Sequence, residues 1–344
     1  MDAMDILAGA GICRGPRNVL AGAYAAAPIG ITVEGVNILT RSMIIFGQGA
    51  LRGHPFLREE TSALATGDRR RFDRAFFSHV AFTLGNAVRS LRLGLADGRR
   101  VRPPVEGPPG LCVRRLARLS AAFALVSDAS LAVLGGTLKR REAISGRLAD
   151  ALGWLYLGSA AVKRFRDDGQ PVEDLPFLRW SCEHALWQIQ ESLLGVLDNF
   201  PSRAAALALR ALAFPLGARY RVPDDALVAG VARALVEGGG ARRRLTADIY
   251  LPPSHEPGLG ALEAAFGKVL LARPLHERVR EAVRSGALAA DPAETLADRA
   301  LAAGVIGPED RRTIHEADLA REDAVAVDAF TPEGFLSRHR APAA

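Results

Sequence analysis

Apolar residues recur every three or four positions over long stretches of this chain, and this period is the strongest constraint on its fold. The clearest stripe, over residues 72–95, consists of Phe72, Phe76, Val80, Leu84, Val88, Leu91 and Leu95. It predicts an amphipathic helix whose apolar side belongs to the core. Further long helices are expected over residues 111–134, 141–166 and 178–199. Since alanine and leucine dominate and β-branched residues are sparse, the sequence predicts an all-α fold.

Proline and glycine mark the connections between these helices. Residues 98–110 contain four prolines and three glycines, which predicts a loop. Shorter helices are expected over residues 201–215, 226–236, 259–271, 275–283, 292–303 and 308–321, followed by a surface tail. With 344 residues, the chain is long enough for two domains and a sizeable core.

The charge balance limits the classes of partner. The formal net charge is +6, and the arginines are dispersed along the chain. This favours anionic partners such as an acyl-CoA phosphate or a membrane surface. The sequence has no zinc-ligand spacing, RNA-recognition signature or aromatic stacking platform, so nucleic-acid binding is not expected. His184 beside Glu183 has no second ligand at a useful spacing, so a satisfied histidine is favoured over a metal site.

The cysteines and the most apolar segments bear on the cellular location. Cys13, Cys112 and Cys182 are far apart and odd in number. We interpret them as reduced, buried small hydrophobes in a cytoplasmic protein, without a disulfide framework. The N-terminus has no basic region followed by an apolar run, so no signal peptide is expected. The apolar window at residues 119–138 contains Asp128 and two adjacent glycines, which favours a buried helix over a membrane span.

One stretch combines a helical pattern with a residue suited to chemistry. In residues 29–49, IGITVEGVNILTRSMIIFGQG, the lone carboxylate Glu34 lies between Val33 and Gly35 at the start of an amphipathic helix. Flanked by apolar residues, Glu34 is a candidate base. A glutamate in the first turn of a helix also commonly complements the helix dipole. The pattern alone leaves both interpretations open.

The run TVEGVNILTRSMIIFGQGA, preceded by DILAGAGICRGP, closely resembles the C-terminal catalytic segment of bacterial acyl-CoA dehydrogenases of the long, fatty-acid-degrading type. The later stretches LARLSAAFALVSDASLAVLGGTLKRRE, YLGSAAVKRF, NFPSR, FPLGARYRVP and DIYLP resemble the helical extension of the same proteins. The resemblance covers nearly the whole chain. It implies the end of the C-terminal catalytic helical bundle over residues 1–65 and a multi-helix extension domain over residues 66–344.

The resemblance also implies a reaction. Family members convert medium- or long-chain acyl-CoA to trans-2-enoyl-CoA in fatty-acid β-oxidation, with FAD as cofactor and an electron-transfer flavoprotein as acceptor. Glu34 matches the base that removes the α proton, and Gly35 leaves space for the thioester substrate. Gly9 and Gly11 match a Gly-Gly-x-Gly turn that packs against the adenine-dinucleotide half of FAD, although Ala8 departs from the first glycine.

Family members build most of the flavin and acyl pockets from an N-terminal helical domain and a middle β-domain, neither of which precedes Met1 here. The expectation is that the chain is a C-terminal portion, inactive alone and without tight FAD binding. A homodimer is expected, located in the cytoplasm with peripheral contact to the inner membrane face. The alternative is a non-catalytic helical module for oligomerisation or membrane contact, with Glu34 as a relic.

Overall fold

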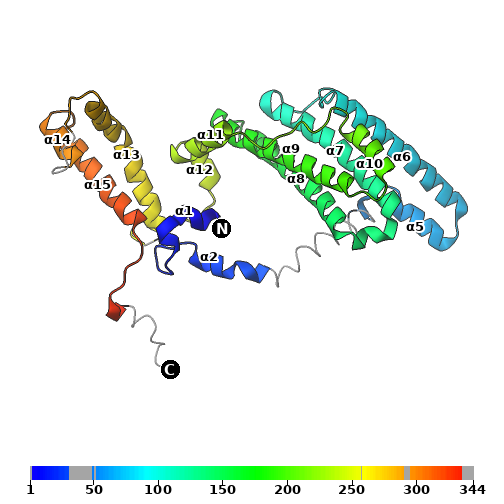
Figure 1. Ribbon diagram of the computed structural model, residues 1–344, viewed down its shortest axis with the longest axis horizontal. Helices are drawn as coiled ribbons and strands as arrows, with labels where there is room; N and C mark the ends of the chain where they lie inside the picture. Colours follow the sequence, from blue (N-terminus) through cyan, green and yellow to red (C-terminus); the bar gives the residue numbers. More distant parts are fainter. Residues whose placement is uncertain (1, 31–48, 50–51, 257, 290–294, 335–344) are drawn as a thin grey trace. The chain divides into compact units, whose positions relative to one another are not determined.

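The computed structural model describes residues 2–30, 49, 52–256, 258–289 and 295–334, and every regular element within these ranges is a helix (Figure 1). The predicted all-α fold is therefore confirmed. Contacts divide the chain into two compact units. We call Gly30–Val236 the central unit, and Met1–Ile29 together with Glu237–Ala344 the terminal unit.

Three long helices form the centre of the central unit: α7 (Gly107–Leu134), α8 (Glu142–Asp167) and α9 (Leu175–Asp198). Helices α6 (Arg69–Leu95) and α10 (Arg203–Ala213) pack on α7, α5 (Leu57–Thr66) packs on α6, and α11 (Asp225–Val236) packs on α9. The core is aliphatic, and its most deeply buried side chains include Leu119, Val126, Leu186, Ile189, Leu193 and Val196. All the long helices predicted from the apolar period are present.

Short-range signals set the ends of these helices. The carboxylate of Asp68 caps α6 by accepting a hydrogen bond from the backbone N–H of Arg71 at 3.0 Å, and Ser202 caps α10 in the same way. Helix α7 begins at Gly107, whose φ is +71°, and continues into two prolines at positions where no backbone N–H is needed. The predicted loop over residues 98–110 therefore ends earlier, at residue 106.

Among the described helices, the segment Gly107–Arg140, which joins α7 to the 3-10 helix η4 (Gly135–Arg140), is long and apolar enough to cross a membrane. It nevertheless carries two buried charges with protein partners. Arg118 donates a hydrogen bond to the hydroxyl of Tyr220 at 2.7 Å, and Asp128 contacts His79 on α6. Since buried charges need partners, α7 fits the interior of a folded unit, as predicted.

A disulfide joins α7 to α9, which corrects the prediction that all three cysteines are reduced. Cys112 and Cys182 are paired with a Cα–Cα distance of 6.0 Å, while Cys13 is free. Both paired residues are buried and stand 70 positions apart in the sequence. A separation of this length carries no pairing signal, because the contact arises only when α7 packs against α9.

The apolar stripe of α6 faces outward, which contradicts the prediction that it belongs to the core. Its exposed members are Phe76, Val80, Leu84, Val88 and Leu95. The helix buries mainly small or polar residues on its other side, namely Ala75, Asn86, Ser90 and Gly94 together with Leu93. These let neighbouring helices approach closely, since a Cβ at Gly94 would lie 2.8 Å from the ring of Pro215. The core side of α6 thus follows from close packing, which periodicity does not reveal.

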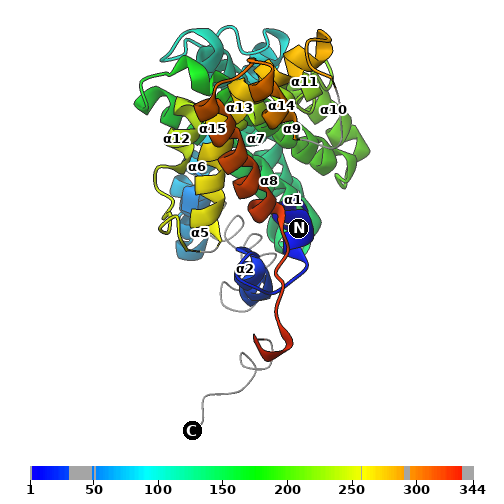
Figure 2. The ribbon, with the colours of Figure 1, turned by 90° about the vertical axis from the view of Figure 1, so that its left-hand side faces the viewer.

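The terminal unit is built on α13 (Leu259–Arg284) and α15 (Pro308–Val325), which lie side by side in Figures 1 and 2, with α14 (Leu296–Ala302) packed on both. Their small core includes Val279, Ala282, Leu288, Ala300, Ile306 and Ile314. The two helices predicted over residues 259–271 and 275–283 are one continuous helix that contains Pro274. Because Pro274 is exposed, water can satisfy the carbonyl group left free by its missing N–H.

The remaining helices of the terminal unit are α1 (Asp2–Leu7), η1 (Ala8–Gly11), α2 (Ala21–Ala26), η2 (Ala27–Ile29) and α12 (Gly240–Thr246). Arg17 links this N-terminal part to α15 through an ion pair with Asp323 at 2.5 Å. Its backbone N–H also contacts the carboxylate of Asp328 at 3.3 Å. The domain boundary at residue 65 was expected from the family resemblance. The contact-based division into two units does not test it, so it remains a prediction.

Candidate functional site

The two residues predicted to handle the substrate, Glu34 and Gly35, lie outside the described residues. Their roles as base and as space for the thioester remain predictions. Of the predicted site residues, the described structure places Gly9 and Gly11, which share the short helix η1. A Cβ at Gly9 would lie 3.1 Å from a side-chain carbon of Val327, so this glycine already permits a close contact within the terminal unit.

Gly11 is constrained in a similar way. A Cβ at this position would lie 3.0 Å from the carbonyl oxygen of Met4, which belongs to the preceding helix α1. The absence of a side chain is therefore explained by local packing at both glycines. Their proximity to FAD stays a prediction.

Four polar side chains meet inside the central unit, at the junction of α5, α6 and α7. His54 lies just before α5, Glu60 on α5, His79 midway along α6 and Asp128 on α7. Only 9% of the His54 side chain and 4% of the Asp128 side chain are exposed, and Glu60 and His79 are mostly buried. We call these four residues the relay.

His79 bridges the two carboxylates of the relay. Its Nδ1 lies 2.8 Å from Oε1 of Glu60, and its Nε2 lies 2.8 Å from Oδ1 of Asp128. Because both ring nitrogens face carboxylate oxygens, both carry protons and the ring is an imidazolium. Thr83 donates its hydroxyl to the second oxygen of Asp128. The charges therefore alternate from Glu60 through His79 to Asp128.

The start of α5 sets the protonation of His54. Its Nδ1 accepts hydrogen bonds from the backbone N–H groups of Phe56 and Leu57, both at 3.2 Å. These N–H groups have no partner within the helix, so the ring acts as a helix cap. The proton of neutral His54 is then on Nε2, 3.3 Å from Oδ1 of Asp128. The distance permits a hydrogen bond but the angle is poor, so the contact is mainly electrostatic.

The ligand atoms of His54, His79 and Asp128 lie within 4.8 Å of one another, a spacing that could hold a metal ion. A histidine binds metal through an unprotonated nitrogen, usually while its other nitrogen donates to a carboxylate or carbonyl. His79 has such a partner in Glu60, but Nδ1 of His54 faces two N–H donors. His54 would lose both capping bonds if it presented a lone pair on Nε2. The geometry therefore favours an ion-pair relay over a metal centre.

The protonation behaviour of the relay follows from this geometry. Burial alone would raise the pKa of Asp128, but the hydrogen bonds from His79 and Thr83, together with the contact from His54, outweigh it and lower this pKa to about 2. Burial would likewise lower the pKa of His79, but its hydrogen bonds to Asp128 and Glu60 leave this pKa raised. Both shifts favour the charged forms, so the relay contains an ion pair near neutral pH.

An apolar pocket of about 290 Å³ adjoins the relay. Its walls are mainly Phe82, Phe123, Leu131, Leu138, Leu148 and Leu152, with His54, Ser127 and Asp128 on one polar side. This volume is near the lower end for ligand pockets, which span about 300–1,000 Å³. The pocket can accept a small apolar group. Because the adjacent Nε2 of His54 carries a proton, it cannot activate a nucleophile such as Ser127 as a base.

Comparison with known families settles the affiliation of this fold. A family model of the C-terminal domain of bacterial-type acyl-CoA dehydrogenases matches residues 51–330. The chain belongs to this family. The resemblance inferred from the sequence motifs is thereby confirmed, and the match includes every residue of the relay. No solved structure matches the chain.

The relay of this acyl-CoA dehydrogenase domain was not predicted from the sequence. The sequence contains one indication of the relay: the carboxylate of Asp128 interrupts the most apolar window of the chain. A buried carboxylate requires a partner, so its position already implied an internal ion pair or hydrogen bond. The partner could not be identified from spacing, since His79 lies on a different helix, 49 positions earlier.

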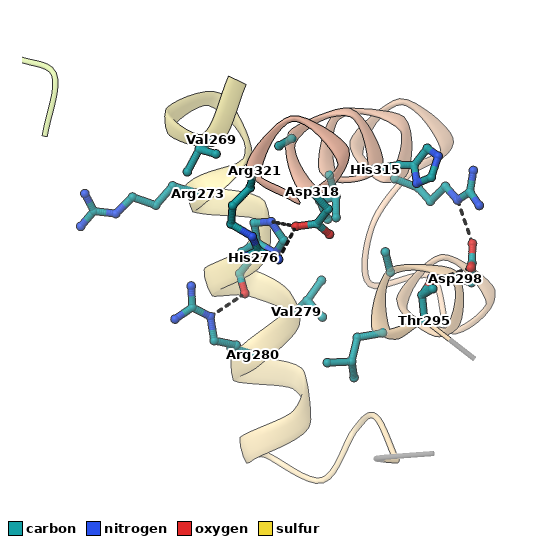
Figure 3. Close-up of a pocket in the computed structure, with 15 residues that line it drawn as sticks. Val269, Arg273, His276, Val279, Arg280, Thr295, Asp298, His315, Asp318 and Arg321 are labelled. Carbon is teal, nitrogen blue, oxygen red and sulfur yellow. Dashed lines mark hydrogen bonds and ion pairs between the residues drawn. The ribbon is translucent and has the colours of Figure 1, made fainter. Parts of the chain in front are cut away.

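The terminal unit of the domain contains a larger pocket of about 670 Å³ among α13, α14 and α15 (Figure 3). His276 and Arg321 both point toward Asp318, at 3.4 and 3.2 Å. Asp298 lies on the other side of the pocket in Figure 3, and it pairs with Arg311 at 2.8 Å. Four arginines and two aspartates line the pocket, so these pairs leave it with an excess of positive charge.

His184, which the sequence suggested was a satisfied histidine, packs among all three tryptophans of the chain. Its ring centroid lies 4.9 Å from Trp154, 4.9 Å from Trp180 and 5.6 Å from Trp187. Burial lowers the pKa of His184. This aromatic cluster makes His184 a packing residue of α9 in the acyl-CoA dehydrogenase domain.

Proposed function

We propose that this chain is part of an FAD-dependent acyl-CoA dehydrogenase that converts medium- or long-chain acyl-CoA to trans-2-enoyl-CoA. Family membership over residues 51–330 supports the oxidoreductase class. The observation that carries the proposal is the TVEGVN segment at residues 32–37, which precedes the matched region that begins at residue 51. Fatty-acid β-oxidation in the cytoplasm is the corresponding pathway.

In this proposal Glu34 is the base. Removing the α proton of an acyl thioester requires a carboxylate held against the α carbon in a site closed to water. Gly35 leaves room for the thioester, and the backbone N–H of Glu34 polarises its carbonyl group, which stabilises the negative charge that develops on oxygen. FAD supplies the hydride acceptor that protein side chains lack.

The described residues do not form a flavin cradle by themselves. Gly9 and Gly11, the two assigned to FAD by resemblance, already use their missing side chains against Val327 and Met4. The FAD proposal therefore depends on the family and on the N-terminal helical and middle β-domains of a complete enzyme. An electron-transfer flavoprotein as acceptor and a homodimeric assembly belong to the same proposal.

The test is Glu34→Gln in an enzyme that includes the flavin-binding domains. We expect turnover of acyl-CoA to fall about 10²–10⁴-fold, the usual contribution of a general base, while FAD content stays unchanged. The matched control is Glu59→Gln, which removes an exposed carboxylate paired with Arg71. Equal turnover by the two variants would refute the role of Glu34.

A second candidate function is a non-catalytic helical module for oligomerisation or membrane contact, with Glu34 as a relic. The outward apolar side of α6 favours it, because exposed apolar stripes commonly mark interaction surfaces. The Glu34→Gln experiment separates the two candidates. Unchanged turnover supports the second, whereas loss of turnover with retained FAD supports the first.

A further inference from the structure

We propose that the outward side of α6 is a docking surface for an anionic lipid bilayer. This surface, called the α6 face, consists of Phe76, Phe77, Val80, Leu84, Val88 and Leu95. The proposal gives a location to the membrane-contact role considered above. It does not depend on the dehydrogenase reaction.

From Phe76 to Val88 the α6 face is apolar and continuous along the helix. Phe77, Leu84 and Val88 lie on one side because seven residues complete nearly two helical turns, and they are 67%, 63% and 56% exposed. Between Arg74 and Arg89 the sequence is AFFSHVAFTLGNAV, in which the sole ionisable side chain is that of the relay histidine. That histidine is held inward, so no charge interrupts the exposed surface here.

Arginines border this surface at both ends. Helix α6 carries six arginines and one aspartate. Arg70 and Arg74 are exposed at its N-terminal end, and Arg89 and Arg92 are exposed near its C-terminal end. None of these four has an ion pair with another residue of the described ranges. Apolar residues bordered by arginines match a lipid surface, where acyl chains accept the apolar side chains and anionic head groups attract the arginines.

Charge also argues against a second copy as the occupant. In an antiparallel pair of α6 helices, Arg70 and Arg74 of one chain would face Arg89 and Arg92 of the other. In a parallel pair, each arginine cluster would face its own copy. Both arrangements bring like charges together at the ends of the contact, whereas an anionic bilayer complements both ends at once.

The opposite side of α6 is anchored, so the surface is already formed before binding. His79 is tied to Glu60 and Asp128, and the hydroxyl of Ser90 donates to the carbonyl oxygen of Leu212 at 3.2 Å. Docking therefore requires no unfolding of α6. Because the proposed surface excludes the buried residues, it can be altered without removing core side chains.

Vesicle flotation tests the proposal with the full chain. We expect co-flotation with vesicles of phosphatidylcholine containing phosphatidylserine at about 30 mol%, and little flotation with phosphatidylcholine alone. Binding should weaken at high salt, because salt screens attraction between arginines and head groups. The variant Phe77→Ser/Leu84→Ser/Val88→Ser should lose roughly tenfold in partitioning for each side chain removed from the bilayer.

Two further variants complete the design. Arg70→Gln/Arg74→Gln should reduce partitioning about fivefold for each arginine, and only with anionic vesicles. Leu157→Ser, which changes an exposed apolar residue on α8, is the matched control and should float like the unmodified chain. Circular dichroism verifies that each variant retains its helices.

Three outcomes would overturn the proposal: no flotation of the unmodified chain, equal flotation of the triple-serine variant, or sedimentation showing that the α6 face instead forms a dimer. The last outcome assigns the surface to a second copy of the chain. Because the assay uses neither substrate nor flavin, a negative result leaves the Glu34→Gln test unaffected.

Discussion

Replacing Asp128 by asparagine should destabilise the central unit, because it removes the charge shared by the whole relay while preserving the shape of the side chain. The carboxylate is 4% exposed and accepts hydrogen bonds from Thr83 and His79, with the Nε2 proton of His54 close by. An amide presents one oxygen and one NH₂ group, so at least one donor would then face another donor. In a buried site water cannot repair this mismatch.

The size of the effect follows from the pKa of Asp128. This pKa is about 2 in the folded protein, compared with about 3.9 for an unperturbed aspartate. A difference of nearly two units corresponds to about 2.5 kcal/mol of stabilisation of the charged form. We therefore expect Asp128→Asn to lower the free energy of unfolding by about 2–3 kcal/mol near neutral pH.

The loss should also depend on pH. The lowered pKa of Asp128 contributes stability that is present above its unfolded pKa and is lost as the pH falls toward about 2. The raised pKa of His79 works in the opposite sense, since its contribution is present below the unfolded pKa of about 6.5 and is lost as the pH rises through the raised value. The attraction between the two residues is thus stronger at pH 6 than at pH 9, and the cost of Asp128→Asn should follow it.

Urea unfolding monitored by tryptophan fluorescence measures this cost, because all three tryptophans belong to the central unit. The matched control is Asp73→Asn, which changes an exposed aspartate on α6 outside the relay. This control should lower the free energy of unfolding by under about 1 kcal/mol. The role of Asp128 is refuted if Asp128→Asn lowers the free energy of unfolding no more than the control does, or if it lowers this free energy equally at pH 6 and pH 9.

Thiol titration of the denatured, unreduced chain should find one free thiol, whereas three free thiols would contradict the Cys112–Cys182 pairing. Reduction of this disulfide should lower the free energy of unfolding by up to about 4 kcal/mol, the value expected for a closed loop of this length. The tryptophan emission should change as His184 titrates below its ordinary pKa, and His184→Gln should abolish that change; an unaltered titration in the variant would reject the assignment. Gly260→Ala should lower the free energy of unfolding by about 1–3 kcal/mol, because the new Cβ would lie 2.3 Å from a backbone carbonyl oxygen. The control Gly267→Ala meets nothing within 4 Å and should not lower the stability measured by thermal unfolding.

The sequence allowed the helices to be located because their existence depends on local properties. Apolar period, capping residues and proline-rich connections all act within a few positions, and they placed α7, α8 and α9 to within a few residues. The interruption predicted within α13 was wrong because Pro274 happens to lie on the exposed side of the helix. Whether a proline breaks a helix depends on what surrounds it, which is a tertiary property.

The orientation of helices and the pairing of distant residues could not be predicted in this way. Helix α6 has an apolar side and a side of small residues, and only its packing against α7 and α10 shows that the small residues are buried. The bridge between Cys112 and Cys182 and the contact between His79 and Asp128 likewise depend on which helices become neighbours. Glu34, by contrast, was identified by its motif, and its role stays a prediction.

The two charged residues buried along α7 affect the free energy of inserting this helix into a bilayer. During synthesis, the apolar α7 emerges before α8 and α9 can cover it, and by hydropathy it could be taken for a membrane anchor. Arg118 and Asp128 make insertion costly, by roughly 2.5–3.5 kcal/mol for each charge near the middle of a bilayer. The same side chains that bind Tyr220 and His79 in the folded state therefore raise the free energy of placing α7 in a lipid bilayer.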